Sequence, residues 1–102
     1  MEQNQMEVAR EILRQLGENK FKAMTGANTF TGSDYSLSFR FKMCRKANLC
    51  RITLNALDLY DIEFFKNSPG QGKCLLVETF SGIYNDGLVE TFETFTGLNT
   101  SL

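Results

Sequence analysis

The chain contains no histidine, no tryptophan and a single proline in 102 residues. Without histidine it cannot build a Ser-His-Asp or Cys-His arrangement, and it lacks the commonest general base near neutral pH. No stretch approaches the roughly 18 apolar residues of a membrane span. The first ten residues, MEQNQMEVAR, lack the apolar core of a signal peptide. These absences predict a cytoplasmic protein that is not an enzyme, does not enter a membrane and uses no cofactor.

Cysteine is also sparse, with Cys44, Cys50 and Cys74 forming an odd number. Small secreted domains stapled by disulfides carry more cysteines in pairs, so we expect reduced thiols. A structural zinc site takes four Cys or His ligands, and here it would need all three cysteines plus a carboxylate. We instead expect Cys44 and Cys50 to flank a turn and Cys74 to pack as a small apolar residue.

Apolar residues are abundant, because they make up 42% of the chain and include nine phenylalanines. This composition predicts one folded domain spanning residues 1–102 around a single core. The net charge is only −1, yet the charges are segregated along the chain. Residues 20–51 carry a net charge of +6, whereas residues 52–102 carry −5. Such asymmetry suits a face that recognises an anion, or a self-complementary surface between copies of the chain.

Both ends of the chain show helical periodicity. Apolar residues recur at helical spacing from Met6 to Leu16, and Gly17 fits the left-handed residue that ends the helix. Near the other end, Tyr84, Leu88, Phe92 and Phe95 form a second stripe, with Ser81 or Asn85 as the cap and Gly97 as the close. Two amphipathic helices are therefore predicted, each with an apolar face that a sheet could cover.

The middle of the chain alternates as strands do. We expect a short strand and a bend over residues 21–30, followed by a turn at 31–34. Two strands follow at 36–43 and 50–56, and a turn at 55–58 ends the second. The next strand has Tyr60, Ile62 and Phe64 inward, and a loop at 67–73 connects it to a strand at 74–80. Short connections favour antiparallel pairing. The predicted fold is α+β: a mainly antiparallel sheet of about five strands, flanked by N- and C-terminal amphipathic helices packed on one face.

The stretch SFRFKMCRKANLCR, residues 38–51, holds five of the eleven cationic residues. In a hairpin of strands 36–43 and 50–56, alternation places Phe39 and Phe41 in the core. The same alternation predicts one outward face carrying Arg40, Lys42, Arg51, Thr53 and Asn55, with Arg45 and Lys46 on the connection. These seven residues are the candidate binding site. They suit phosphate groups, an acidic protein surface, or the acidic half of a neighbouring subunit. Unpaired sheet edges and phenylalanine-rich faces favour assembly, so we expect a homo-oligomer.

Two further groups of residues allow other interpretations. Asp58, Asp61 and Glu63 could hold a hard cation such as magnesium, although we favour solvated carboxylates, so no metal site is predicted. Tyr35 and Tyr60 could stack on a nucleotide base, or could serve in the core or an interface.

The strings FKAMTGANTF, SLSFRF, RITLNALDLYDIEF and IYNDGLVETFETFTGLNTSL together resemble a family of small uncharacterised proteins of bacteriophages and integrated mobile elements. The likeness spans most of the chain, to its terminal TGLNTSL, and brings no catalytic residues with it. What the resemblance implies is a setting, a phage product acting in the cytoplasm of a host bacterium.

In that setting we expect a non-enzymatic accessory protein, of an anti-defence type, that binds and blocks or sequesters a host component. The component would be a nucleotide signal or a nucleic-acid-binding effector. The alternative is a nucleic-acid-binding protein of phage replication or recombination, which would use the same basic residues on a strand backbone. Two other classes stay open: a metal-dependent enzyme centred on the three carboxylates, and a purely structural role for the basic residues within an oligomer.

Overall fold

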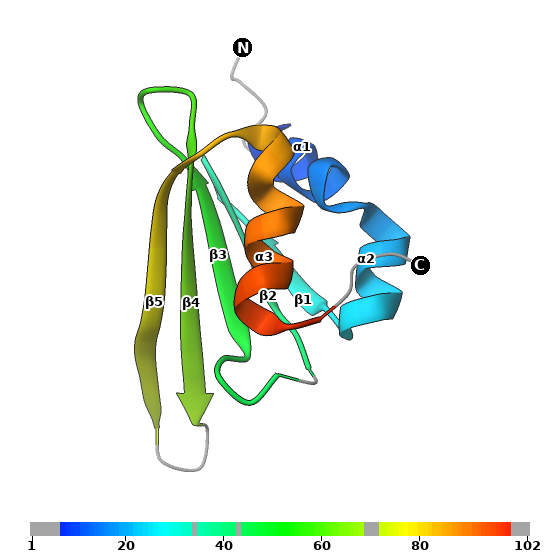
Figure 1. The fold of residues 1–102 in the computed structure, drawn as a ribbon, viewed down its shortest axis with the longest axis vertical. Helices are drawn as coiled ribbons and strands as arrows, with labels where there is room; N and C mark the ends of the chain where they lie inside the picture. The colour runs from blue at the N-terminus through cyan, green and yellow to red at the C-terminus, as the bar shows by residue number, and fades with distance from the viewer. Residues whose placement is uncertain (1–6, 34, 43, 69–71, 99–102) are drawn as a thin grey trace.

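The computed structural model describes residues 7–33, 35–42, 44–68 and 72–98, and it consists of a sheet with helices on one face (Figure 1). Its elements, in order, are α1 (Glu7–Leu16), α2 (Glu18–Thr25), β1 (Asn28–Gly32), β2 (Ser36–Arg40), β3 (Leu49–Leu54), β4 (Tyr60–Ser68), β5 (Lys73–Ile83), the 3-10 helix η2 (Asn85–Gly87) and α3 (Leu88–Thr96). The five strands pair in the order β1-β2-β3-β4-β5, each antiparallel to the next. The predicted α+β fold is therefore confirmed.

The core lies between the inner face of the sheet and the helices. Its residues alternate along the strands and recur at helical spacing, as in Leu37, Phe39, Ile52, Ile62 and Phe64 from the sheet and Ala9, Ile12, Leu16, Leu88 and Phe92 from α1 and α3. The Phe92 ring is central, because its centroid lies 5.1 to 6.1 Å from the rings of Phe21, Phe39, Phe41 and Phe64. Phe39 and Phe41 are thus core residues, as predicted.

The first correction concerns residues 21–25, which were predicted as strand and form helix α2. Gly17 ends α1 in the left-handed region at φ 110°, as expected, but the chain then begins a second helix at once. Phe21 and Thr25 are both buried, one helical turn apart, and the Thr25 hydroxyl donates to the Phe21 carbonyl at 2.8 Å. The irregular alternation was in fact helical spacing, and the strand starts only at Asn28.

The second correction concerns the start of the C-terminal helix. Strand β5 continues to Ile83, so Ser81 is a strand residue, and Asn85 opens η2 while α3 begins only at Leu88. Neither proposed cap residue caps α3, and Tyr84 is 69% exposed instead of buried. The prediction that Gly97 ends the helix is confirmed, because its φ is 76° and its N–H donates to the Glu93 carbonyl at 2.8 Å.

The turn between β3 and β4 agrees with the prediction in its position. Asp58 stays on the surface with φ 63°, and Tyr60, Ile62 and Phe64 then point into the core. The predicted strand 50–56 extended to Ala56, but Ala56 is exposed, because β3 ends at Leu54 and the turn has already begun.

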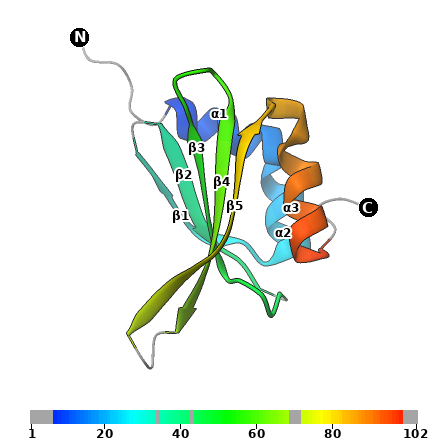
Figure 2. The ribbon, with the colours of Figure 1, turned by 60° about the vertical axis from the view of Figure 1, so that its left-hand side comes forward.

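The hairpin of β4 and β5 is longer than expected and extends beyond the helical layer (Figure 2). The predicted loop 67–73 is narrower in the structure, since Asn67 and Ser68 belong to β4 and Lys73 begins β5. Phe64 pairs with Glu78 and the next residue, Phe65, pairs with Leu76. Val77 is therefore the extra residue of a β-bulge, and the register shifts by one residue there. We call the part beyond this bulge, residues 65–68 and 73–77, the arm.

Candidate anion-binding site

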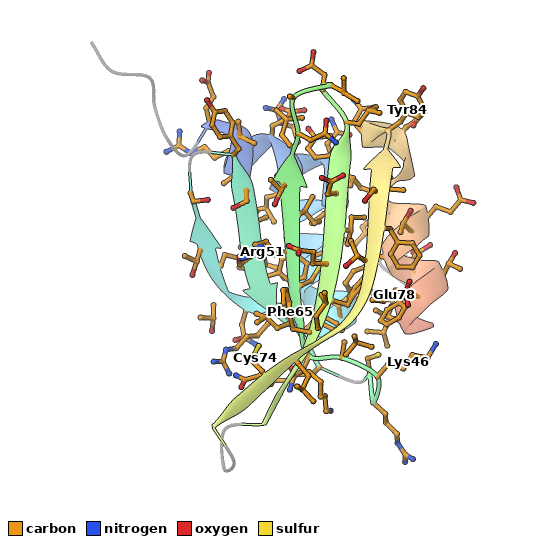
Figure 3. The ribbon with its side chains drawn as sticks, turned by 90° about the vertical axis from the view of Figure 1, so that its left-hand side faces the viewer. Lys46, Arg51, Phe65, Cys74, Glu78 and Tyr84 are labelled. Carbon is orange, nitrogen blue, oxygen red and sulfur yellow. The ribbon has the colours of Figure 1, made fainter. Side chains whose placement is uncertain are left out.

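The β2-β3 hairpin places three of the seven candidate residues on the outer face of the sheet, the face away from the helices (Figure 3). Ser38 lies opposite Arg51 and Arg40 opposite Leu49, while the intervening Phe39 and Cys50 are buried. Because side chains alternate along strands, Arg40, Arg51 and Thr53 share the outer face, as the sequence predicted. The seven residues nevertheless divide into separate environments.

Arg51 is balanced by a carboxylate on the next strand. Its Nη2 and Nε atoms lie 2.7 and 2.8 Å from Oε1 of Glu63, which is its direct partner in the β3-β4 register. The guanidinium also lies 5.4 Å from the centroid of the Phe65 ring. This pair is partly exposed, so it adds little to stability. Its consequence is electrostatic, because the centre of the outer face is close to neutral.

Thr53 and Asn55 lie beside an acidic residue. Thr53 is opposite Asp61 in the register, and the Asn55 amide donates to the Asp61 carboxylate at 3.2 Å. The Asn55 side-chain oxygen accepts the N–H groups of Leu57 and Leu59 at 2.8 and 3.2 Å. Asn55 therefore organises the turn after β3 instead of extending the basic face.

The two cations of the connection lie elsewhere. Lys46 donates to the Phe95 carbonyl at 3.0 Å and stands 5.1 Å from the Phe95 ring centroid, so it binds the C-terminal turn of α3. A cation is favourable there because the helix end carries free carbonyls and partial negative charge. Arg45 is exposed on the same connection.

Arg40 and Lys42 are brought together around a shallow hollow of about 260 Å³, whose other lining residues are Asn28, Phe41 and Asn48. The hollow forms where β2 ends, because the chain leaves the sheet to meet the end of α2. The Lys42 N–H donates to the Thr25 carbonyl at 3.0 Å. Gly26 leaves room for the Lys42 chain, since a Cβ there would lie 3.1 Å from the Lys42 Cβ.

Asn28 and Asn48 were not predicted as site residues. Asn48 accepts the Asn67 N–H at 2.8 Å and donates to the Asn67 carbonyl at 2.9 Å, so it joins the hollow to the root of the arm. Asn28 donates to the Gly26 carbonyl at 3.0 Å. A lone asparagine in a connection has no periodicity, and its partner lies 19 residues away, so no local pattern could have revealed it.

Among the side chains that the structure describes, no three of the His, Cys, Asp or Glu type come together in a way that could hold a metal ion. Asp61 accepts hydrogen bonds from Asn55 and from the Gly82 N–H, and Glu63 pairs with Arg51. These carboxylates are used within the sheet.

The cysteines are free and differ in exposure. Cys50 is fully buried, and this burial, with a smaller contribution from Glu63, raises the pKa of its thiol well above the ordinary value. Cys44 is half-buried. Cys74 was expected to pack as an apolar residue, but it is exposed on the arm, because the arm has no helix over it (Figure 2).

The two tyrosines proposed for base stacking also differ. Tyr60 is a core residue, and its pKa is raised mainly by burial and further by Glu11 and Asp58. Tyr35 is 61% exposed and lines a hollow of about 400 Å³ with Leu54, Asn55, Ala56 and Asp58. Its neighbour Asp58 is a carboxylate, which disfavours phosphate at that place.

Comparison with known proteins adds no family assignment, because the sequence matches no protein-family model and gives no match among curated proteins or solved structures. Within the part of the chain that the structure describes, no helix is long and apolar enough to cross a membrane.

Proposed function

We propose that this chain is a non-enzymatic binding protein whose ligand carries a phosphate group, held in the hollow between Arg40 and Lys42. The observation that carries the proposal is the convergence of these two cations on one hollow whose other polar walls are the amides of Asn28 and Asn48. In the setting that the family resemblance implies, the protein would be a phage accessory protein that sequesters a nucleotide signal of a host defence system.

The chemistry of the lining residues suits a phosphate. A guanidinium can donate two parallel hydrogen bonds to phosphate oxygens, and an ammonium group adds a compact charge. Asn28 and Asn48 each use one side-chain N–H within the protein, toward the Gly26 and Asn67 carbonyls. An amide carries two N–H donors, so each keeps one that could reach a ligand.

The charge distribution favours a small ligand over a nucleic-acid strand. A strand-binding surface needs cations that follow the backbone over several nucleotides. Here the cation next along the face, Arg51, is paired with Glu63, and Thr53 lies opposite Asp61. The hollow, of about 260 Å³, can hold the phosphate and part of the sugar of a nucleotide. The strand-binding alternative would need Arg51 to leave its partner.

The proposal is tested by calorimetric titration with inorganic phosphate, linear nucleotides and cyclic dinucleotides. Arg40→Ala and Lys42→Ala are each expected to weaken binding about tenfold or more, because a charge-assisted hydrogen bond contributes roughly 1.5–3 kcal/mol. Arg10→Ala is the matched control, since it removes an exposed cation from α1. It is expected to leave the affinity unchanged.

Two results would contradict this function. One is that no phosphate-bearing ligand of the panel binds the wild-type protein. The other is that binding occurs but Arg10→Ala weakens it as much as Arg40→Ala and Lys42→Ala do, which would reveal only a general effect of net charge.

A further inference from the structure

The arm exposes apolar side chains on the last strand of the sheet. Leu75, Leu76 and Val77 are 61%, 55% and 40% exposed, and Cys74 beside them is exposed as well. In Figure 3 the arm, with Cys74 labelled on it, lies below the rest of the sheet. Four consecutive exposed residues of this kind differ from the single apolar residues that are normal on protein surfaces.

The arm is also poorly supported by the rest of the fold. A two-stranded ribbon is at best marginally stable in water, because it cannot bury an apolar face by itself. The helices cover the inner face of the sheet above the bulge, where the ring centroid of Phe95 in α3 lies 6.0 Å from that of Phe80 in β5, whereas the arm extends past them (Figure 1, Figure 2). Its described contacts with the body lie at its root: Asn48 makes hydrogen bonds to Asn67 and to the Phe65 carbonyl, and Phe65 pairs with Leu49 of β3 and lies under the Arg51 guanidinium.

The chemistry of this surface specifies a β-strand as its partner. Strand β5 is the terminal strand of the sheet and pairs with β4. An edge strand presents a row of backbone N–H and C=O groups that another strand can bind, and charges or prolines normally discourage this. The stretch Cys74–Val77 carries neither.

We infer that the arm pairs with the arm of a second copy of this chain, β5 to β5 in antiparallel orientation across a two-fold axis, to form a continuous ten-stranded sheet. This inference does not depend on the proposed ligand. It makes the protein a homodimer with a defined interface, centred at Leu75.

The register follows from the two faces of the arm. Cys74 and Leu76 lie opposite Asn67 and Phe65, on one face, and Leu75 lies opposite Lys66 on the other. In an antiparallel pair, opposite residues share a face. A two-fold axis at Leu75 meets this condition, because it places Leu75 opposite Leu75 of the partner subunit and Cys74 opposite Leu76 of the partner subunit.

The second copy is favoured over an unrelated strand because the arm is complementary to itself. In this register each residue from Cys74 to Leu76 meets another apolar residue, and no charge is buried between them. Sliding the pair toward the middle of β5 would bring Glu78 opposite Glu78 of the partner subunit. Like charges directly opposite are destabilising in a sheet, so the apolar end of β5 is selected.

The first test is sedimentation velocity over a concentration series for the wild type, Leu75→Glu and Leu76→Glu. The wild type is expected to be a dimer, and each arm variant is expected to raise the dimer dissociation constant on the order of 100-fold. Leu75→Glu places two like charges opposite each other, and Leu76→Glu places a charge opposite Cys74 of the partner subunit. Leu57→Glu is the matched control, because Leu57 is 78% exposed in the turn after β3. It should dimerise as the wild type does.

A cross-link tests the register independently of affinity. In a background of Cys44→Ser and Cys74→Ser, Leu75→Cys should form an intermolecular disulfide on mild oxidation, because opposite Cα atoms of an antiparallel pair lie about 4.5–5.5 Å apart. Leu57→Cys in the same background should not. Circular dichroism checks that each variant is folded. We expect both to be folded, because Leu57 and Leu75 are exposed.

Three results would overturn the inference. They are a wild-type protein that stays monomeric at its highest soluble concentration, a dimer that Leu75→Glu and Leu76→Glu leave intact, and a disulfide from Leu57→Cys as readily as from Leu75→Cys. The first would leave a strand of another protein as the occupant of the arm. The other two would place the dimer contact elsewhere on the molecule.

Discussion

A single residue, Asn48, links the hollow to the arm. Its side chain lines the hollow with Arg40 and Lys42, and it makes two hydrogen bonds to the backbone of Asn67. Its backbone N–H donates to the Phe65 carbonyl at 2.9 Å. The connection between β2 and β3 therefore pairs with β4 just before β3 begins at Leu49. Asn48 supports both proposed binding surfaces.

Replacing Asn48 with alanine should destabilise the protein by about 1–3 kcal/mol. The Asn67 N–H and carbonyl would lose their partners, and partly buried polar groups without partners carry a cost of this size. Urea unfolding followed by circular dichroism measures the change. Asn28→Ala is the control, because Asn28 is exposed and its side chain makes only local bonds, donating to the Gly26 carbonyl and accepting from the Thr29 hydroxyl. A loss for Asn48→Ala no larger than for this control would contradict the role of Asn48.

At the scale of elements, helix α2 determines where Lys42 lies. The helix ends at Gly26, whose φ of 71° is in the left-handed region, and the Gly26 N–H donates to the Lys22 carbonyl at 2.9 Å. Strand β1 then pairs with β2, so the end of α2 contacts the chain just after β2. The close approach of Gly26 and Lys42 is a consequence of this packing.

Two of the left-handed glycines at helix ends, Gly26 and Gly97, provide a matched pair of substitutions. Gly97→Ala should cost about 1 kcal/mol, since its φ is 76° but a Cβ there would meet open space. Gly26→Ala should cost about 2 kcal/mol, because it adds contact with Lys42 to the same backbone strain. Urea unfolding of both variants makes the comparison. Equal losses would show that the contact with Lys42 relaxes freely.

For the whole molecule, the fold redistributes the segregated charges. The acidic C-terminal half supplies Glu63 to Arg51, while the carbonyl end of α3 receives Lys46. Both contacts join residues far apart in the chain: Glu63 neutralises Arg51, and the Phe95 carbonyl holds Lys46 at the end of α3, away from the other cations of the predicted patch. Arg40 and Lys42 remain together at the hollow.

This distribution predicts a weak salt dependence for binding of a short single-stranded oligonucleotide. The logarithm of affinity should fall against the logarithm of salt concentration with a slope of about −1.4, because single strands give about −0.7 per phosphate contact and two cations are available. Fluorescence anisotropy over a salt series measures the slope. A slope near −3.5 would mean about five contacts and would support the strand-binding alternative.

Much of the fold was determined by the sequence itself, because it rests on short-range periodicity. Alternation placed Phe39, Phe41 and Ile62 in the core, and helical spacing identified α1. The turn at Asp58 and the end of α3 at Gly97 follow from local backbone chemistry. These features depend on neighbours within a few residues, which a sequence displays directly.

Only the tertiary structure decided which cations stay together. The sequence shows Arg40, Lys46 and Arg51 alike, as cations of one stretch. In the structure Arg51 binds Glu63, which lies 12 residues away in the chain, and Lys46 binds the Phe95 carbonyl, which lies 49 residues away. The helix α2 likewise depends on what packs against it, as Phe21 shows against Phe39 and Phe92. Such contacts form between segments distant in the chain, so the local pattern of either segment cannot reveal them.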